Sequence, residues 1–200
     1  TPIAGLGWGS VNKDKPVVTC VGHNAAVATV MIDHLMKNGL YDQVEVTGIC
    51  CTAQDNIRYS DKTKIIGPLS KQLFFLRTGI SDLVITDEQC VRCDIPEVAK
   101  QMGSALIATS DKISYGLEDA THKEVDEIIK MITEEGKQVL ILDVDKAGEV
   151  AAKVLPIVAK NRKKELVTKE KAKELADNCK KCALCDRVCP NLLVISEAVA

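Results

Sequence analysis

The sequence predicts an α/β domain built on a doubly wound parallel sheet, and three features support this prediction. Short runs rich in valine and isoleucine alternate with helical stretches between residues 16 and 144. Most of the runs are apolar at consecutive positions, which is typical of parallel strands buried on both faces. A glycine follows each helical stretch, where a left-handed residue ends a helix well. Because βαβ crossovers are right-handed, this alternation predicts a Rossmann-like sheet.

The individual elements follow in order along the chain. The predicted strands are 16–21, 44–49, 82–86, 105–109 and 138–144, with 64–66 as a weaker candidate. The predicted helices cover 25–38, 69–78, 95–102 and 122–135, and the glycines that close them are Gly39, Gly79, Gly103 and Gly136. The last helix also begins with a Thr-x-x-Glu pattern, Thr121 to Glu124, which predicts a capping box for its free amides.

The alternation of predicted strands and helices ends near residue 146. The following segment predicts two helices, the first disturbed by Pro156 and the second led by Thr168. Glutamates interrupt the lysines of 160–173, so a solvated helix face is favoured there over a basic interaction patch. We place a domain boundary near residue 165. Residues 1–165 are expected to form the Rossmann-like domain, and residues 166–200 a helix and the beginning of a ferredoxin-type segment.

Composition narrows the class of protein. The chain has 200 residues, of which 46% are hydrophobic, so its core needs no disulfide staples. Nine cysteines without a signal peptide or membrane-length apolar run indicate a reduced, cytoplasmic protein. A net charge of −2 gives no argument for nucleic acid or an anionic membrane as a partner. We expect metals and proteins as partners. Because no initiator methionine precedes Thr1, we also expect a piece of a longer chain.

A cysteine run near the end of the chain is the most specific motif. CKKCALCDRVCP, residues 179–190, has the C-x2-C-x2-C-x3-C-P spacing of bacterial ferredoxins. This spacing predicts that one 4Fe-4S cluster is held by Cys179, Cys182 and Cys185, and that Cys189 ligates a neighbouring cluster. Zinc is the alternative, but its four ligands usually come in two distant pairs. No cysteine follows in the last eleven residues, so the missing ligands must come from other sequence.

A second group of candidate ligands follows three predicted strands. His23 comes after strand 16–21, Cys50 and Cys51 after 44–49, and Cys90 shortly after 82–86. The carboxyl ends of parallel strands share the edge where open α/β sheets build their sites. A histidine and thiols there form a soft donor set that suits iron, nickel, copper or zinc. Neighbouring strand residues point to opposite faces, so one thiol of the Cys50–Cys51 pair is expected to pack while the other binds.

Other cysteines and histidines have simpler explanations. Cys20 lies within a strand and is expected to be a small core residue. CVRC, residues 90–93, could be a redox pair or half of a zinc site, although such spacing arises by chance in cysteine-rich chains. His34 and His122 lie in predicted helices and are interpreted as packing or surface residues. GLGWGS at 5–10 precedes the first main strand, whereas a dinucleotide-binding loop would follow it.

Three strand-end motifs together carry a family resemblance. VGHNA at 21–25, GICCT at 48–52 and DEQC at 87–90, followed by the ferredoxin-type run, resemble the α subunit of the anaerobic nickel–iron carbon monoxide dehydrogenases of methanogenic archaea. The resemblance extends over essentially the whole chain. It implies that His23 holds the iron outside the cubane, that Cys51 shares this iron, and that Cys90 holds a cubane iron of a nickel–iron–sulfur (Ni-4Fe-4S) cluster. Cys50 would then face away.

The resemblance also implies a reaction and partners. The reaction is CO + H2O ⇌ CO2 + 2H+ + 2e−, with electrons leaving through 4Fe-4S clusters to a ferredoxin-type carrier. The implied partners are a small accessory subunit and acetyl-CoA synthase and corrinoid subunits, around a homodimeric core. The nickel-bound thiolate and the proton-relay residues would lie outside these 200 residues, so the chain alone is expected to be inactive. A prismane-type hybrid-cluster enzyme and a non-catalytic electron conduit remain alternatives.

Overall fold

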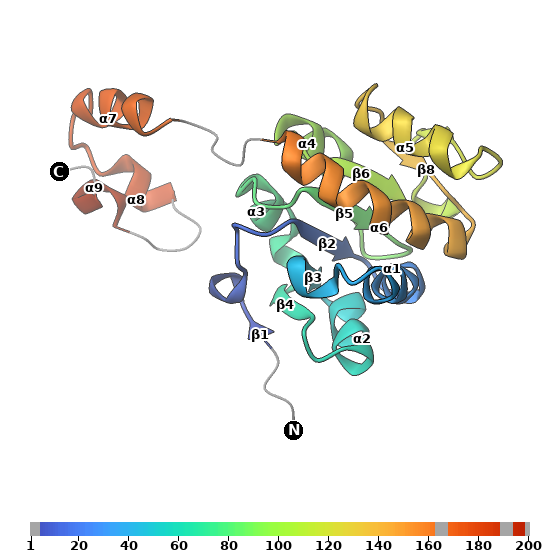
Figure 1. The fold of residues 1–200 in the computed structure, drawn as a ribbon. Helices are drawn as coiled ribbons and strands as arrows, with labels where there is room; N and C mark the ends of the chain where they lie inside the picture. The colour runs from blue at the N-terminus through green and yellow to red at the C-terminus, as the bar shows by residue number, and fades with distance from the viewer. Residues whose placement is uncertain (1–4, 163–167, 189–193, 199–200) are drawn as a thin grey trace. The chain divides into compact units, whose positions relative to one another are not determined.

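A computed structural model describes residues 5–162, 168–188 and 194–198 of the chain. Its strands form one parallel sheet in the order β1-β4-β3-β2-β5-β6-β8-β7 (Figure 1). The strands are β1 Gly5–Leu6, β2 Val17–Val21, β3 Glu45–Ile49, β4 Lys64–Gly67, β5 Leu83–Thr86, β6 Ala105–Ala108, β7 Glu118–Asp119 and β8 Val139–Leu140. From β2 the chain winds first to β3 and β4 and then, from β5, to the other side. The predicted doubly wound fold is confirmed.

The strand predictions differ from the structure mainly at the edges of the sheet. The short strands β1 and β7 were not predicted, because two-residue strands carry no apolar pattern that sequence analysis can detect. The predicted strand 138–144 is shortened to Val139–Leu140. The reason is Asp143, whose side chain accepts a hydrogen bond from the Lys146 amide at 2.9 Å and so starts helix α6 at Val144.

The helices lie close to their predicted positions. They are α1 Ala26–Lys37, α3 Gln72–Arg77, α4 Ile95–Gln101, α5 Val125–Thr133 and α6 Val144–Asn161, which contains Pro156. All four closing glycines have positive φ angles, between 65° and 70°. The predicted capping box is wrong. Glu124 is the N-cap of α5 and makes no side-chain cap bond, whereas the Thr121 hydroxyl accepts a hydrogen bond from the Leu142 amide at 2.9 Å.

Helix α2, Cys51–Tyr59, was not predicted. Its sequence, CTAQDNIRY, has few aliphatic residues, so no apolar stripe indicated a helix that packs on the sheet. The helix nevertheless contacts β3 closely. A Cβ atom at Gly48 would lie 2.7 Å from the Cβ atom of Ala53, so glycine is needed where α2 crosses the strand.

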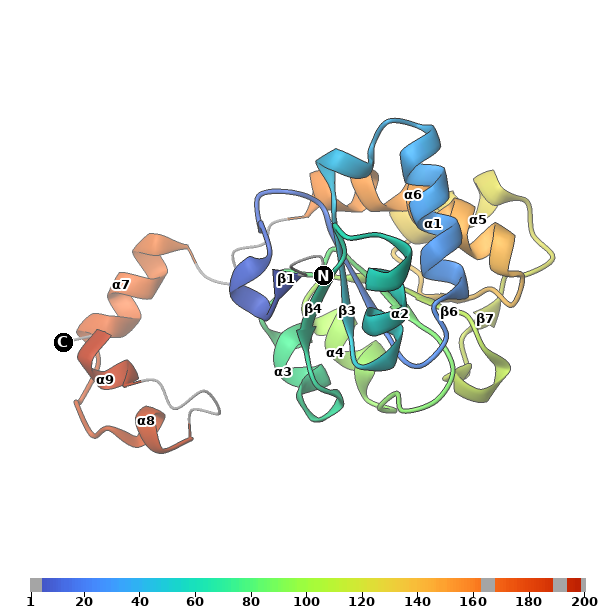
Figure 2. The same ribbon diagram turned by 90° about the horizontal axis from the view of Figure 1, so that it is seen from below.

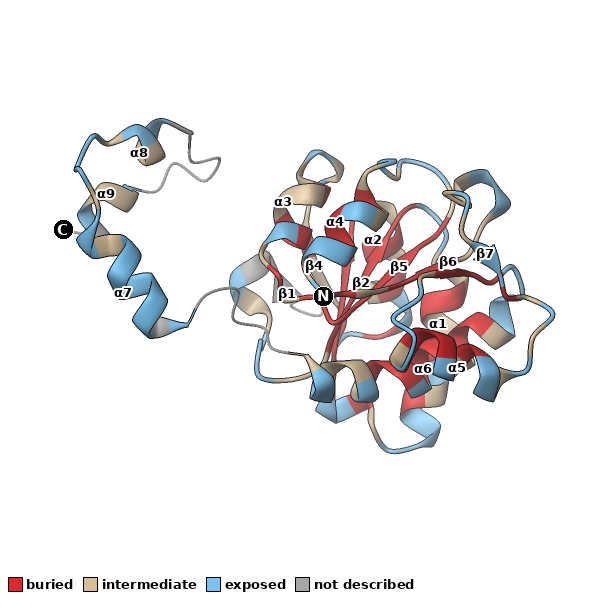
Figure 3. Cartoon of the chain, turned by 90° about the horizontal axis from the view of Figure 1, so that it is seen from above, coloured by how far each residue is buried: buried red, intermediate tan, exposed pale blue. Residues whose placement is uncertain are grey.

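Two apolar cores cover the two faces of the sheet. Helices α1, α5 and α6 pack on one face, with Met31, Ile128 and Leu155 among the buried residues. Helices α3 and α4 pack on the other, with Leu76, Ile95 and Val98. Figure 2 shows these two layers on either side of the strands, and Figure 3 shows the central strands as buried. The site therefore has to form at the ends of the strands, where the loops are accessible.

The chain divides into two compact units, residues 1–164 and 165–200. The second unit contains α7 Lys169–Asp177, α8 Leu184–Val188 and α9 Ile195–Ala198. As predicted, Thr168 caps α7, since its side chain accepts a hydrogen bond from the Lys171 amide at 3.2 Å. Within the described part of the chain, no helix is both long enough and apolar enough to span a bilayer.

Candidate metal centre at the carboxyl edge of the sheet

The three predicted ligand loops begin at one place on the sheet. Strands β3 and β5 are the two neighbours of β2, and Val21 pairs with Ile49 on one side and with Thr86 on the other. Between β2 and β5 the strand order reverses, which is the topological switch point where Rossmann-like folds bind their ligands. The segments carrying His23, Cys51 and Cys90 therefore leave the sheet side by side.

The backbone at His23 is held by a buried carboxylate. Asp87, which follows β5, accepts hydrogen bonds from the amides of His23 and Asn24, the latter at 2.9 Å. Gly22 has a φ of 140°, and a Cβ atom there would lie 1.9 Å from Asp87 Oδ1. Only glycine permits this approach, which leaves His23 itself exposed at the edge.

Asp87 was not predicted as a site residue, although it is the first residue of the DEQC motif. It is only 4% exposed. Burial raises the pKa of its carboxyl to about 6, against the opposing effect of hydrogen bonds from the Asn24 and His23 amides. The signal available in the sequence was a carboxylate placed directly after a buried strand.

The two adjacent thiols lie together, and the prediction that Cys50 faces away is wrong. The strand ends at Ile49, and Cys50 has a φ of 65° as the N-cap of α2. This left-handed residue reorients the chain, so the alternation of a strand no longer applies. The Sγ atoms of Cys50 and Cys51 are 3.6 Å apart, and both residues are half-buried. Cys50 also packs against the apolar core beside α3 and α4, as predicted for one thiol of the pair.

Cys90 lies within electrostatic reach of this pair. The pKa of Cys51 is raised, first by its hydrogen bond with Cys50 and by burial, and then by the charges of Cys50, Cys90 and Asp55. Gln89 and Cys90 are consecutive left-handed residues, with φ angles of 64° and 57°. Such backbone is unfavourable without glycine, so the surrounding structure must hold it in place.

Gln72 of α3 provides this support, and sequence analysis did not identify it. Its side-chain amide donates to the Cys90 carbonyl at 2.6 Å and accepts from the Arg92 amide at 3.2 Å. Gln72 is buried, with 1% of its surface exposed. Cys93 is exposed on the same loop, and the neighbouring Tyr115 hydroxyl donates to the Arg92 carbonyl at 3.4 Å.

The donors fit a soft metal cluster in kind, but the described residues do not complete a site. Among the described residues, no group of three or more histidine, cysteine or acidic side chains is close enough to hold a metal ion. The residues that carry the imidazole and the thiols are exposed or half-buried at one edge of the sheet. Buried side chains, Asp87 and Gln72, hold the backbone of His23 and Cys90. Such an arrangement suits a cluster whose remaining ligands come from elsewhere.

Two cysteines of the second unit, Cys179 and Cys182, lie on a tightly turned loop, and Cys185 follows in α8. Lys181 and Ala183, which separate Cys179, Cys182 and Cys185, have φ angles of 51° and 55°. The Lys181 amide donates to Cys179 Sγ at 3.4 Å, the type of N–H···S bond that tunes iron–sulfur clusters. Burial, followed by its interaction with Asp186, raises the pKa of the Cys185 thiol. Cys189 lies outside the described residues.

The chain combines a doubly wound domain that has soft donors at its switch point with a ferredoxin-type cysteine run. This combination is typical of metal-cluster oxidoreductases. The chain matches the Prismane/CO dehydrogenase family over residues 2–181. It therefore belongs to the Prismane/CO dehydrogenase family, and the resemblance found in its strand-end motifs is confirmed.

Curated relatives are similar over nearly the whole chain. It is 47% identical to the acetyl-CoA decarbonylase/synthase complex subunit alpha of Methanocaldococcus jannaschii over 100% of the chain. It is 46% identical to the corresponding subunit of Methanothermobacter thermautotrophicus over 99% of the chain. In both comparisons it spans 26% of the relative, so it corresponds to about a quarter of those subunits.

Solved structures share the fold. Carbon monoxide dehydrogenase IV from Carboxydothermus hydrogenoformans has a TM-score of 0.59 at 15% identity, covering 78% of this chain and 23% of that one. A Ni-free carbon monoxide dehydrogenase from Thermococcus sp. AM4 has the same TM-score at 22% identity, covering 79% of this chain and 23% of that one. At these identities the likeness supports the architecture alone.

Proposed function

We propose that the chain is the Rossmann-like, cluster-binding portion of a carbon monoxide dehydrogenase that catalyses CO + H2O ⇌ CO2 + 2H+ + 2e−. The observation that carries this proposal is the meeting of the three ligand loops at the switch point of a chain that belongs to the Prismane/CO dehydrogenase family. His23, Cys51 and Cys90 are the proposed ligands in this chain. When bound, the nickel–iron–sulfur cluster supplies a soft nickel for CO and a Lewis-acidic iron for water.

The chain's own task is to present these donors in a fixed arrangement. Asp87 fixes the backbone that precedes α1 and so determines where the His23 imidazole can reach. Cys51 is the first residue of α2, a rigid element, and Gln72 fixes the loop of Cys90. Donors on backbone held by buried partners lose little entropy when they bind a cluster, which favours its assembly.

The cysteine run of the second unit is the proposed electron relay. Cys179, Cys182 and Cys185 would hold one 4Fe-4S cluster, and Cys189 would contribute to another. Electrons would pass from there to a ferredoxin-type carrier. The relatives are named as subunits of the acetyl-CoA decarbonylase/synthase complex. We therefore propose acetyl-CoA synthase, corrinoid and small accessory subunits as partners of a homodimeric core in the cytoplasm.

The test uses the full-length parent protein, produced anaerobically. Nickel and iron contents and CO-dependent dye reduction are measured for the unmodified protein and for His23→Ala. We expect CO oxidation to depend on nickel and to be lost in the variant. The isolated 200-residue chain should show none, because its donors are too few for the cluster. Nickel-dependent turnover by the isolated chain would contradict this assignment.

A prismane-type hybrid-cluster enzyme is the second candidate, since the family name covers both types. Parent protein that contains iron but no nickel, and that does not oxidise CO, would favour it. If instead His23→Ala left every activity of the parent complex intact, the chain would be a non-catalytic electron conduit.

A further inference from the structure

Helix α2 presents a row of polar residues to the interior of the protein. Thr52, Asn56 and Ser60, the residue after the helix, are spaced four apart and so lie along one face. Thr52 and Asn56 are 0% exposed and Ser60 is 8% exposed. A helix that packs on a sheet normally turns aliphatic residues inward. This row, which we call the polar stripe, therefore requires a specific explanation.

Asn56 is the central member, and among the described residues its side chain has no hydrogen-bonding partner. Within the described part of the chain, neither its Oδ1 nor its Nδ2 atom has a hydrogen-bonding partner, and both are fully buried. The hydroxyl of Thr63, which is also 0% exposed, is in the same situation. A buried amide offers two donors and two acceptor lone pairs, and leaving them unpaired is unfavourable. Buried polar groups of this kind are commonly satisfied by internal water.

The polar stripe connects the candidate metal centre to the opposite edge of the sheet. At one end, the Thr52 amide donates to the Gly22 carbonyl at 3.3 Å, and the buried Thr52 hydroxyl has no hydrogen-bonding partner among the described residues. At the other end, the hydroxyls of Ser60 and Tyr41 are hydrogen-bonded at 2.5 Å, and both residues are buried. Since α2 starts after the carboxyl end of β3 and Thr63 directly precedes β4, the stripe runs the length of the strands.

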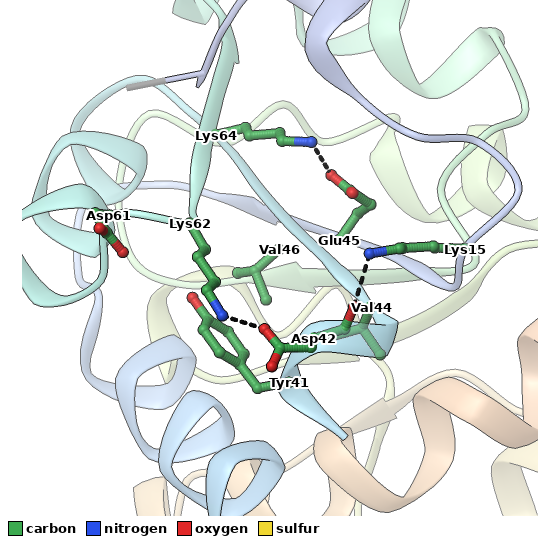
Figure 4. Close-up of a pocket in the computed structure, with 9 residues that line it drawn as sticks. All are labelled: Lys15, Tyr41, Asp42, Val44, Glu45, Val46, Asp61, Lys62 and Lys64. Atoms are coloured by element: carbon green, nitrogen blue, oxygen red, sulfur yellow. Dashed lines mark hydrogen bonds and ion pairs between the residues drawn. The ribbon is translucent and has the colours of Figure 1, made fainter. Parts of the chain in front are cut away.

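Tyr41 opens onto a charged pocket at the amino edge. The pocket has a volume of about 430 Å³, and Figure 4 shows its lining of Lys15, Tyr41, Asp42, Val44, Glu45, Val46, Asp61, Lys62 and Lys64. The Lys62 ammonium pairs with Asp42 and lies 5.6 Å from the centre of the Tyr41 ring. The side chains of Lys62 and Asp42 are exposed to solvent, so this end of the polar stripe lies next to bulk water.

The spacing of the stripe matches bridging by single water molecules. Side chains four residues apart on a helix have Cβ atoms roughly 5–6 Å apart. Two hydrogen bonds of about 2.8 Å through one water join polar atoms up to about 5.6 Å apart, a span of the same size as the separation of these side chains. We propose that α2 covers an internal file of water molecules that runs along Thr52, Asn56 and Ser60 to the Tyr41 hydroxyl, and so links the candidate metal centre to the charged pocket.

On the proposed function, this water file is a second path for the protons that CO oxidation releases, beside the relay residues that the resemblance places outside these 200 residues. Each water accepts a proton from the side of the centre and passes another towards Tyr41. One proton thus reaches the pocket for each transfer, and no group changes its oxidation state. The two electrons leave separately through the iron–sulfur clusters. The direction is reversed when CO2 is reduced.

The water file itself is tested by a crystal structure of the full-length parent at a resolution that reveals ordered water. We expect water molecules hydrogen-bonded to both polar atoms of the Asn56 amide and to the Thr63 hydroxyl. Leucine has a volume similar to that of asparagine but no polar side-chain atoms. In Asn56→Leu, the water molecules next to residue 56 should therefore be absent. Protein groups from the rest of the parent chain in their place would overturn the proposal. This readout does not depend on activity.

The proton role is tested with Tyr41→Phe and Thr52→Val, and Tyr59→Phe serves as the matched control. Tyr59 lies on the outer side of α2, is 47% exposed and bonds to Asp33. In the first two variants we expect normal nickel and iron contents, CO oxidation slower by roughly tenfold or more, and a larger solvent isotope effect. The control should be unchanged.

Several outcomes separate the two proposals. Unchanged rates and isotope effects in both Tyr41→Phe and Thr52→Val, each with a loaded cluster, would overturn the proton role. A parent protein that does not oxidise CO would overturn the proposed function and the proton role together. In that case the crystal structure would still decide whether the water file exists. If Thr52→Val fails to fold, Tyr41→Phe alone decides the proton role, because it removes only a hydroxyl.

Discussion

Asp87 occupies the space that a side chain at residue 22 would need: a Cβ atom at Gly22 would lie 1.9 Å from Asp87 Oδ1. The same oxygen accepts a hydrogen bond from the backbone amide of His23. A single contact between the end of β2 and the end of β5 therefore fixes the position of the proposed histidine ligand.

Gly22→Ala should displace this contact. We expect the 200-residue chain to lose about 2 kcal/mol or more of unfolding free energy, because the substitution adds a clash to a backbone with a φ of 140°. In the full-length protein, nickel and iron contents should also fall. Gly9→Ala is the control, since no atom lies within 4 Å of its Cβ position. Equal thermal stability of the two variants would contradict the prediction.

Cys51→Ala should abolish active-site metal and CO oxidation in the full-length protein, because it removes a proposed ligand. Cys50→Ala should be milder, with a loss of unfolding free energy of about 1 kcal/mol from lost packing. Cys50→Val should be less stable than Cys50→Ala, since a β-branched residue suits a φ of 65° poorly. Metal analysis of both variants decides which cysteine is the ligand. If the Cys50 variant lacked the cluster and the Cys51 variant kept it, Cys50 would be the ligand instead of Cys51.

Gln72→Met keeps the volume of the buried side chain but removes both of its bonds to the Cys90–Arg92 loop. We expect a loss of unfolding free energy of about 1–3 kcal/mol and a lower iron content, as the left-handed backbone at Cys90 relaxes. Gln101→Met, on an exposed residue that bonds to Glu97, should have little effect. Full iron occupancy in Gln72→Met would show that Cys90 does not need this support.

Asp87 should make the stability of the metal-free chain depend on pH. Its pKa is raised from an ordinary value of 3.8 to about 6, so between these values the folded protein keeps a proton that the unfolded chain has released. Unfolding free energy should therefore fall as the pH rises from about 4 to about 6, by up to ~3 kcal/mol. Asp87→Asn removes this contribution. The measurement is denaturant titration of both proteins at pH 4 and pH 7. The same difference in unfolding free energy between Asp87→Asn and the unmodified chain at both pH values would contradict this role of Asp87.

Cys182→Ser in the full-length protein should degrade one 4Fe-4S cluster and slow electron transfer to a ferredoxin-type carrier. Small dyes that reach other clusters should still be reduced, because the active cluster is held elsewhere. Rates with both acceptors, together with the electron paramagnetic resonance of the reduced clusters, measure this. An equal loss with both acceptors would indicate that the cysteine run supports the active site.

The sequence by itself determined the architecture and the chemistry of the donors. Consecutive Val and Ile positions specify strands buried on both faces, and the glycines after the helices specify where they end, because both signals arise from local backbone and burial preferences. Parallel strands then place His23, the cysteine pair and Cys90 at one edge, whatever the details of packing.

Only the tertiary structure decided how these donors are held. Asp87 contacts residues 22–24 from 63 or more positions away, and Gln72 reaches Cys90 across 18. Helix α2 forms although its sequence is mostly polar, since it is stabilised by its contact with Gly48 and the sheet. A single residue, Cys50, separates the end of the strand from the start of that helix, and the sulfur atoms of Cys50 and Cys51 lie together. These features depend on contacts between distant segments, and local sequence patterns carry no record of such contacts.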